Sequence, residues 1–291
     1  MSKFQRQYRI EATTKDGEKI VITNPFTLNF VIVRHQLSSA ANATLKIYNL
    51  GLETRMKLLK NAWEKNSDYY FPIRLYAGYE GMMPLVLRGA IYPEARSYRA
   101  EGSPDFMTEV EVYDGGFDMA HGDSNFSVSA GTLRVEAIKR LCKDFPNLKI
   151  GAIGNFPGAY ARQRVFAGKT KQLIMEETGG NFFIDNEHVY CLKDNEAIEG
   201  EVLVISSETG LLGSPSRTKG LVIAEMLFEP RLKVGQVVEL VSKDYPSLNQ
   251  LYKVIGVQHT GTISDAVGGK CKTRVTMKFG LQSFKIVRSE S

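Results

Sequence analysis

The residues that could carry chemistry are few and scattered along this chain of 291 residues. None of the histidines belongs to an HExxH pattern or stands at zinc-ligand spacing from a cysteine; they are His35, His121, His188 and His259. No GxSxG nucleophile elbow occurs, and the segment 213–216 predicts a turn. We therefore expect surface or hairpin histidines and no catalytic, metal-binding or cofactor-binding residues.

One carboxylate pair could suit hydrolysis of a glycosidic bond. Glu109 and Glu111 alternate with Val110 and Val112, which places both glutamates on one face of a predicted strand, about 7 Å apart. That separation is compatible with glycoside chemistry, so a cell-wall hydrolase is one alternative. The alternation fits the polar face of a half-buried strand at least as well, and we expect no catalysis there.

Two glycine patterns resemble phosphate-binding loops only in part. Gly168-Lys169-Thr170 matches the end of a Walker A motif, but Gln163 stands where its first glycine belongs. Gly151, Gly154 and Gly158 have the wrong gaps for GxGxxG. We expect a loop that enters a helix at Thr170 and a flexible loop around the three glycines.

Charge and cysteine usage point to no special partner. The net charge is +5, with 37 basic residues interspersed among 32 acidic ones. The densest basic segment, 160–164, predicts a solvated loop, although a DNA-binding module remains a further alternative. The cysteines are expected to be buried free thiols; they are Cys142, Cys191 and Cys271.

Targeting signals are not expected. The apolar runs are much shorter than the roughly 18 residues of a membrane span. The N-terminus opens on polar residues with no apolar stretch behind them, so we expect no signal peptide and no membrane binding.

Residues 1–120 predict a small antiparallel β-barrel or sandwich. Segments 8–12 and 20–22 flank the hairpin signal Asp16-Gly17. Further strands are predicted at 28–35, 43–48, 73–77, 85–92 and 108–113, with a turn at 114–116. One helix interrupts them at 53–63, with its apolar face formed by Met56, Leu59 and Trp63.

Residues 121–200 predict a small α+β insert, and residues 201–291 a second β module. The insert contains a helix at 133–144 capped by Thr132, a helix at 171–178 that ends at Gly179, and a hairpin at 181–192. The second module contains strands at 202–206, 221–228, 237–242, 251–259 and 273–279. The fold class is therefore mainly β with an α+β insert.

A colinear series of short phrases resembles phage tail baseplate hub proteins of the late-control-D-like family. It begins with Thr44 to Leu50 followed by Glu53-Thr54-Arg55. It continues through segments 73–79, 87–91, 108–115, 131–133, 166–168, 209–215, 232–235 and 252–261. Each phrase is degenerate alone, and their shared order over residues 44–261 carries the resemblance.

This resemblance implies a non-enzymatic structural protein with two tail-tube-like antiparallel β-barrels flanking the insert. It implies a homotrimer at the centre of the baseplate, in contact with the tail tube protein, the central spike protein and baseplate wedge proteins. DNA would pass only as cargo through the lumen, during genome ejection from a contractile-tail type of virion assembled in the host cytoplasm. Another baseplate or tail-terminating protein is the nearest alternative. The residues of the interfaces are unknown from the sequence.

Overall fold

Alternating apolar and polar residues fold most of the chain into strands. The computed structural model describes residues 5–36, 41–63, 70–99, 102, 104–266, 268–280 and 283–289. In β4 (Ala41–Tyr48), for example, the odd-numbered residues are buried and the even-numbered ones face outward, as the period of two requires. The expectation of a mainly β chain is confirmed.

The N-terminal half contributes seven strands and one helix. The predicted hairpin at Asp16-Gly17 joins the first two strands, and Gly17 takes the positive φ of 81° that such a turn needs. The elements are β1 (Arg6–Thr13), β2 (Lys19–Thr23), β3 (Leu28–His35), β4, α1 (Leu52–Trp63), β5 (Pro72–Tyr79), β6 (Leu85–Arg99) and β7 (Phe106–Asp114). Over residues 52–59 of α1, whose burial the structure describes, Leu58 and Leu59 are buried and Met56 is 51% exposed, so the predicted apolar face was right at Leu59 and wrong at Met56. The side chain of Trp63 lies outside what the structure describes.

The C-terminal half begins after residue 200 and closes the chain with strands. It comprises β14 (Leu203–Ser206), β15 (Leu211–Thr218), β16 (Leu221–Leu227), β17 (Val237–Val241), a short 3₁₀ turn (Pro246–Leu248), β18 (Gln250–Ile263), β19 (Cys271–Lys278) and β20 (Lys285–Val287). The turn predicted at 213–216 was wrong, because these residues form part of β15. A register shift between Leu212 and Ser216 accommodates Pro215 there.

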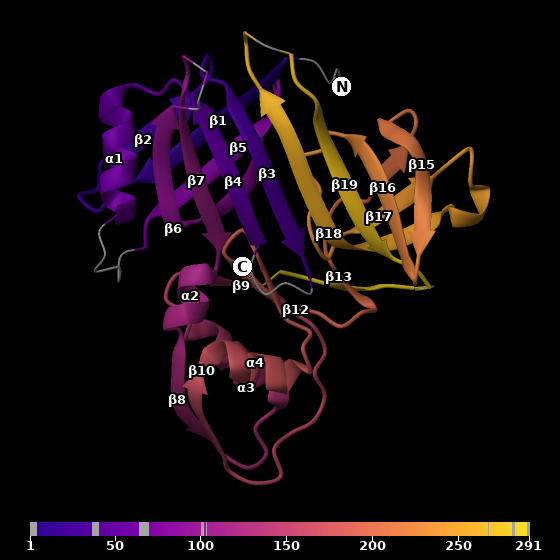
Figure 1. The fold of residues 1–291 in the computed structure, drawn as a ribbon. Coiled ribbons are helices and arrows are strands. Elements are labelled where there is room, and N and C mark those ends of the chain that lie inside the picture. The colour runs from indigo at the N-terminus through magenta and orange to yellow at the C-terminus, as the bar shows by residue number, and fades with distance from the viewer. Residues whose placement is uncertain are drawn as a thin grey trace.

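One sheet of 13 strands joins both halves. Its main path runs β15-β16-β19-β18-β3-β4-β7-β6-β5-β1-β2, and β17 and β14 branch from β18. The two halves meet where β18 pairs antiparallel with β3 over Gly256–Ile263 and Leu28–His35. In Figure 1 the indigo and violet strands of the N-terminal half continue directly into the orange and yellow strands of the C-terminal half. The arrangement of two separate barrels is therefore not confirmed.

Each half surrounds its own apolar core. One cluster lies among β1 to β7 and includes Tyr8, Phe30 and Leu45. A second cluster lies among β14 to β19 and includes Tyr252 and Val275. In each half, the outermost strands contact the same apolar cluster as the strands at the β18–β3 junction. The shared sheet therefore curves around each of the two clusters.

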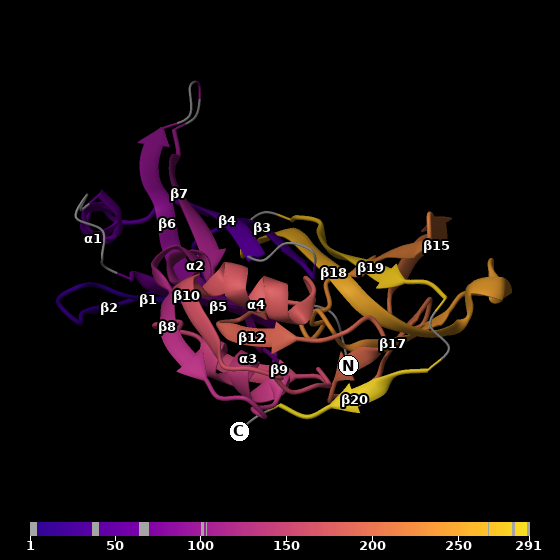
Figure 2. The same cartoon turned by 90° about the horizontal axis from the view of Figure 1, so that it is seen from below.

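The segment between the halves forms an α+β module below the sheet (Figures 1 and 2). Its elements are α2 (Gly116–His121), β8 (Asp123–Val128), α3 (Arg134–Lys143), β9 (Lys149–Ile153), β10 (Arg164–Lys169), α4 (Thr170–Thr178), β11 (Phe183–Asp185), β12 (His188–Cys191) and β13 (Glu196–Ile198). A third apolar cluster fills it, including Leu141, Phe166 and Phe182. The insert is an α+β module, as predicted.

Local details in and next to the insert differ from prediction at four places. The predicted cap Thr132 is wrong, because the N-cap of α3 is Leu133 and no side chain caps that helix. The turn expected at 114–116 opens instead into α2, with Gly115 at φ 72°. Gly151 lies in β9 rather than in a flexible loop, and the stretch before Thr170 is β10 rather than a loop.

Candidate assembly edges and a buried charged junction

The residues singled out for possible chemistry have structural partners. Glu109 is 6% exposed, and its carboxylate accepts hydrogen bonds from Tyr98 Oη (3.0 Å) and Arg96 Nη2 (3.3 Å), with Lys46 Nζ at 3.7 Å. Although burial raises the pKa of Glu109, these hydrogen bonds and cations lower it overall. A carboxylate held in this way serves as the anchor of three neighbouring side chains.

The Walker-like residues and the basic segment are likewise occupied. Lys169 Nζ contacts Asp123 Oδ2 (2.9 Å) and Ala120 O (3.1 Å), so its amine joins two parts of the insert. The basic segment forms a loop over 160–163 with 161–163 exposed, as predicted, whereas Arg164 begins β10 and its guanidinium pairs with the buried Glu177 at 2.7 Å. Neither contact resembles a phosphate or nucleic-acid site.

The cysteines are buried and free, as predicted. Contact with Cys142 and burial both raise the pKa of Cys191, which keeps its thiol protonated. No cluster of three or more potential metal ligands occurs in the described ranges. No helix within those ranges has the length and apolar character of a membrane span.

Open sheet edges are the first candidate for a functional surface. Among the described strands, β2 and β15 end the main path of the sheet, each pairing with one neighbour. Seven of the eight residues of β15 are exposed or half-buried, and only Pro215 is buried. Unpaired strand edges are templates for pairing with another chain, so both ends of the sheet offer assembly surfaces.

A projecting arm is the second candidate surface. β5 pairs with β6 only over Leu85–Ala90, whereas β7 continues along β6 to Arg99. The outer part of this two-stranded arm extends away from the rest of the sheet in Figure 2. Tyr98 is 36% exposed there, which gives the arm a large side chain for contact.

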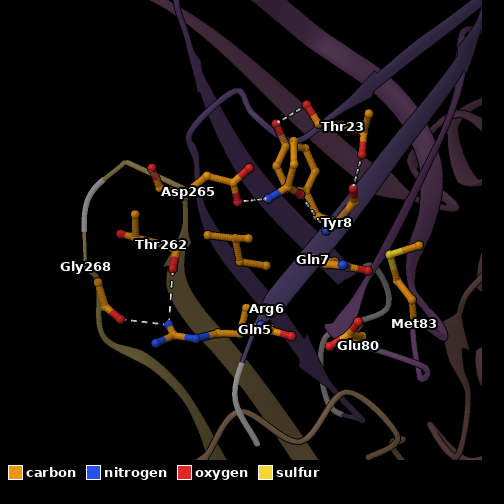
Figure 3. Close-up of a pocket in the computed structure, with 14 residues that line it drawn as sticks. Gln5, Arg6, Gln7, Tyr8, Thr23, Glu80, Met83, Thr262, Asp265 and Gly268 are labelled. Atoms are coloured by element: carbon orange, nitrogen blue, oxygen red, sulfur yellow. Dashed lines mark hydrogen bonds between the residues drawn. The ribbon is translucent and has the colours of Figure 1, made fainter.

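A groove of about 760 Å³ marks the place where β1 approaches the end of β18 (Figure 3). Arg6 Nη1 donates hydrogen bonds to the backbone oxygens of Thr262 (3.2 Å) and Gly269 (2.7 Å). Asn24 Nδ2 donates to Asp265 Oδ1 at 2.5 Å. Arg6 on β1 and Asn24 after β2 thus bind residues at and just beyond the end of β18, although β1 and β18 do not pair as strands. The groove is therefore a contact between segments rather than a reaction site.

A buried charged junction connects the insert to both halves of the sheet. At its centre, Arg34 of β3 is 3% exposed. Its Nη1 contacts Asp185 Oδ1 of the insert at 3.2 Å. Its Nη2 donates to Leu232 O at 3.0 Å and lies 2.8 Å from His259 Nε2, both in the C-terminal half. One guanidinium therefore bonds to all three parts of the protein.

His259 was wrongly predicted at the surface, because it is fully buried on β18. Burial, and secondarily the charge of Arg34, hold the pKa of His259 well below its ordinary value. The neutral ring can therefore accept from Arg34 at Nε2, and its Nδ1–H donates to Thr273 Oγ1 at 2.8 Å. The histidine thus extends the network into β19.

The turn between β11 and β12 forms the other side of the junction. Asn186 and Glu187 have φ of 53° and 59°, a left-handed conformation that costs most residues other than glycine. The carboxylate of Asp114, at the end of β7, accepts the backbone N–H groups of both residues. Asn186 Oδ1 accepts the N–H of Arg88 (2.9 Å), and Glu187 pairs with the guanidinium of Arg88. These bonds hold a strained turn against the sheet.

Sequence comparison finds one similar family. Residues 160–261 match the family described as Baseplate hub gp41. No curated protein sequence matches the chain. The matched region covers the end of the insert and much of the C-terminal half, including β10 to β18.

Solved structures share the fold over almost the whole chain at low identity. The tail protein of Neisseria meningitidis MC58 has a TM-score of 0.60 at 10% identity, covering 94% of this chain and 96% of that one. The 43 kDa tail protein of prophage MuSo2 from Shewanella oneidensis has a TM-score of 0.57 at 9% identity, covering 93% and 97%.

The fold is also similar to that of an Escherichia coli component of the type VI secretion system. That protein is described as structurally similar to the T4 bacteriophage tail proteins gp27 and gp5. Its TM-score is 0.57 at 10% identity, and the match covers 89% of this chain and 75% of that one. Over residues 160–261 the sequence is similar to the family described as Baseplate hub gp41, and over most of its length the chain shares the fold of these tail proteins.

Proposed function

We propose that three copies of this chain form the central hub of a phage tail baseplate and join the tail tube to the spike. The observation that carries this proposal is a single sheet that joins both halves of the chain and ends its main path in β2 and β15, each with one unpaired edge among the described strands. Head-to-tail contact between copies is heterologous, and it closes into a ring when the rotation between copies allows.

The proposal divides the chain into a tube-like module at 1–120, an insert at 121–200 and a second tube-like module at 201–291. Each module retains an apolar core, while the β18–β3 ladder and the Arg34 junction fix the modules to one another. A rigid subunit of this kind suits a part that transmits force between tube and spike. DNA is proposed only as cargo through the lumen of the ring, and wedge proteins as outer partners.

A structural role is favoured over a hydrolytic one by the state of Glu109. Its carboxylate is tied to Lys46, Arg96 and Tyr98, whereas a general acid needs a raised pKa and access to substrate. Absence of peptidoglycan clearing by the purified chain is the expected result. Clearing that is lost in Glu109→Gln would replace the hub proposal with a hydrolase.

The assembly test uses a charge placed on the open edge. Leu212 on β15 is 43% exposed, and Tyr245, in a loop, is 50% exposed. We expect light scattering to give the mass of a trimer for the wild type and for the control Tyr245→Lys. We expect a monomer for Leu212→Lys, with an unchanged circular dichroism spectrum. A wild-type chain that stays monomeric at all micromolar concentrations and binds no tube or spike protein would refute the proposal.

A further inference from the structure

The charged junction contains more buried acids than cations. Asp114, Asp185 and Glu187 are 0%, 4% and 2% exposed. The guanidiniums that face them are Arg34 and Arg88, and arginine stays charged in proteins. Because His259 is neutral and the nearby Arg74 is exposed on β5, the three buried carboxyls are in direct contact with two guanidiniums. A buried carboxylate without a counter-charge takes up a proton rather than stay ionised.

The hydrogen bonds indicate where the excess charge is least compensated. Asp114 is bonded through two backbone N–H groups, and among the described residues it forms no ion pair, although the charge of Arg34 acts on it. Glu187 Oε1 is buried with no hydrogen-bond partner in the described part of the chain. Burial, with the charge of Asp185 second, raises the pKa of Asp114 to about 8, and burial raises that of Glu187 to about 7. Both acids act on the same turn.

The docked turn is also costly in conformation. Asn186 and Glu187 both hold positive φ angles; asparagine tolerates this conformation, whereas it costs glutamate on the order of 1 kcal/mol or more. The turn stays in place because Asp114 and Asn186 bond it to β7 and β6. Its docking therefore depends on the charge balance of the acids that hold it.

We propose that this junction is a proton-dependent latch: the turn between β11 and β12 stays docked on the sheet while its three carboxyls together hold a proton, and it undocks when that proton is lost. The ionisable groups that face the latch come from β3, β5, β6, β7, β11, β12 and β18; they are Arg34, Arg74, Arg88, Asp114, Asp185, Glu187, His188, Tyr190 and His259. The latch is independent of the proposed role in the baseplate.

The sign of the pH dependence follows from proton linkage. The docked state binds a proton that the undocked state releases, so undocking becomes easier as pH rises between the two pKa values of Asp114. With a docked pKa of about 8 and an ordinary undocked value of about 3.9, Asp114 alone raises the undocking constant roughly fifty-fold between pH 6 and pH 8. Above pH 8 its contribution levels off. Above its ordinary pKa of about 6.5 His259 is neutral in both states; below that pH, protonation of an exposed ring would favour undocking and oppose the change from Asp114.

Amide hydrogen exchange of segment 183–191 in the full-length protein tests the latch, after correction for the intrinsic pH dependence of exchange. We expect the undocking constant of the wild type to rise by that factor or more, and the change in Asp114→Asn to be roughly fifty-fold smaller. Asp123→Asn, which removes an exposed carboxylate of the insert, should behave as the wild type. An equal pH response in wild type and Asp114→Asn would overturn the proposal.

Infrared spectroscopy of the wild type can refute the latch even if Asp114→Asn does not fold. Exposed carboxyls are ionised at pH 6.5, so a carbonyl stretch of protonated carboxylic acid at that pH reports a buried proton. We expect this band at pH 6.5 and its loss by pH 9.5, while the circular dichroism spectrum of the sheet is unchanged. Absence of the band at pH 6.5 would show that the junction holds no proton and would overturn the proposal.

Discussion

Replacing Arg34 by methionine should destabilise the protein more than any exposed ion pair can. The substitution keeps an apolar stem of similar length but removes the guanidinium that contacts Asp185, Leu232 O and His259. Arg34 and Asp185 have side chains that are 2% and 4% exposed, so Asp185 is left as a buried and unpaired charge. Such a loss costs about 3–5 kcal/mol.

The loss of the Leu232 contact adds to this cost but does not sum simply with it, because the contacts share one side chain. We therefore expect a fall of about 4 kcal/mol in the free energy of unfolding. The matched control is Lys243→Met, since Lys243 and Glu208 form a pair 79% and 84% exposed. Its expected cost is below about 0.5 kcal/mol.

Urea unfolding followed by circular dichroism measures both variants, provided that the slope m is the same as in the wild type. The double variant Arg34→Met with Asp185→Leu should recover part of the loss, because it removes the orphaned charge as well. A cost for Arg34→Met within about 1 kcal/mol of the control would refute the reasoning that this guanidinium joins the three parts of the chain.

Three further predictions concern other sites. In urea unfolding, Gly115→Ala should lower the free energy of unfolding by at least about 1 kcal/mol more than Gly17→Ala does. Both glycines have positive φ, but only at Gly115 would the new methyl group meet a neighbour, Ile184 Cδ1 at 2.5 Å. The lowered pKa of Glu109 stabilises the fold above the ordinary glutamate pKa of about 4.3, and this contribution is lost as pH falls through the folded value. In thermal scans, the melting temperatures of Glu109→Gln and wild type should therefore differ less at pH 3 than at pH 7. Cys191, buried with a raised pKa, should react with a thiol reagent only at the rate of unfolding, and rapid labelling in native buffer would contradict this.

Strands with a strict alternation were the part of the fold that the sequence predicts best. β2 and β4 follow the period of two without exception, and the Asp16-Gly17 turn fixes the first hairpin. β18 defeats that logic, because its central residues are buried on both faces. His259 lies beyond that stretch, where residues 258–263 alternate and Gly261 and Ile263 share its buried face. The partners that cover this face come from strands distant in sequence, which no local window contains.

The charged junction had a signal in the sequence that was not used. Leu28, Phe30 and Ile32 are the inward residues of β3, so the same period places Arg34 inside. Asp114 follows Val110 and Val112 in the same way on β7. A charge on the buried register of a strand predicts a buried partner. Which partner it meets could not be predicted, because Asp185 is 151 residues from Arg34 along the chain.

The pairing of β18 with β3 has a consequence for how the protein is made. The paired residues are more than two hundred positions apart, and a bacterial or eukaryotic ribosome adds about 5–20 residues per second. Nascent β3 therefore waits on the order of ten seconds or longer with one side of its backbone unmatched, and its exposed Val31 and Val33 make that interval prone to mispairing. Slower translation at low temperature should lengthen the wait, so the yield of native subunit should depend on chaperones that shield unpaired strands.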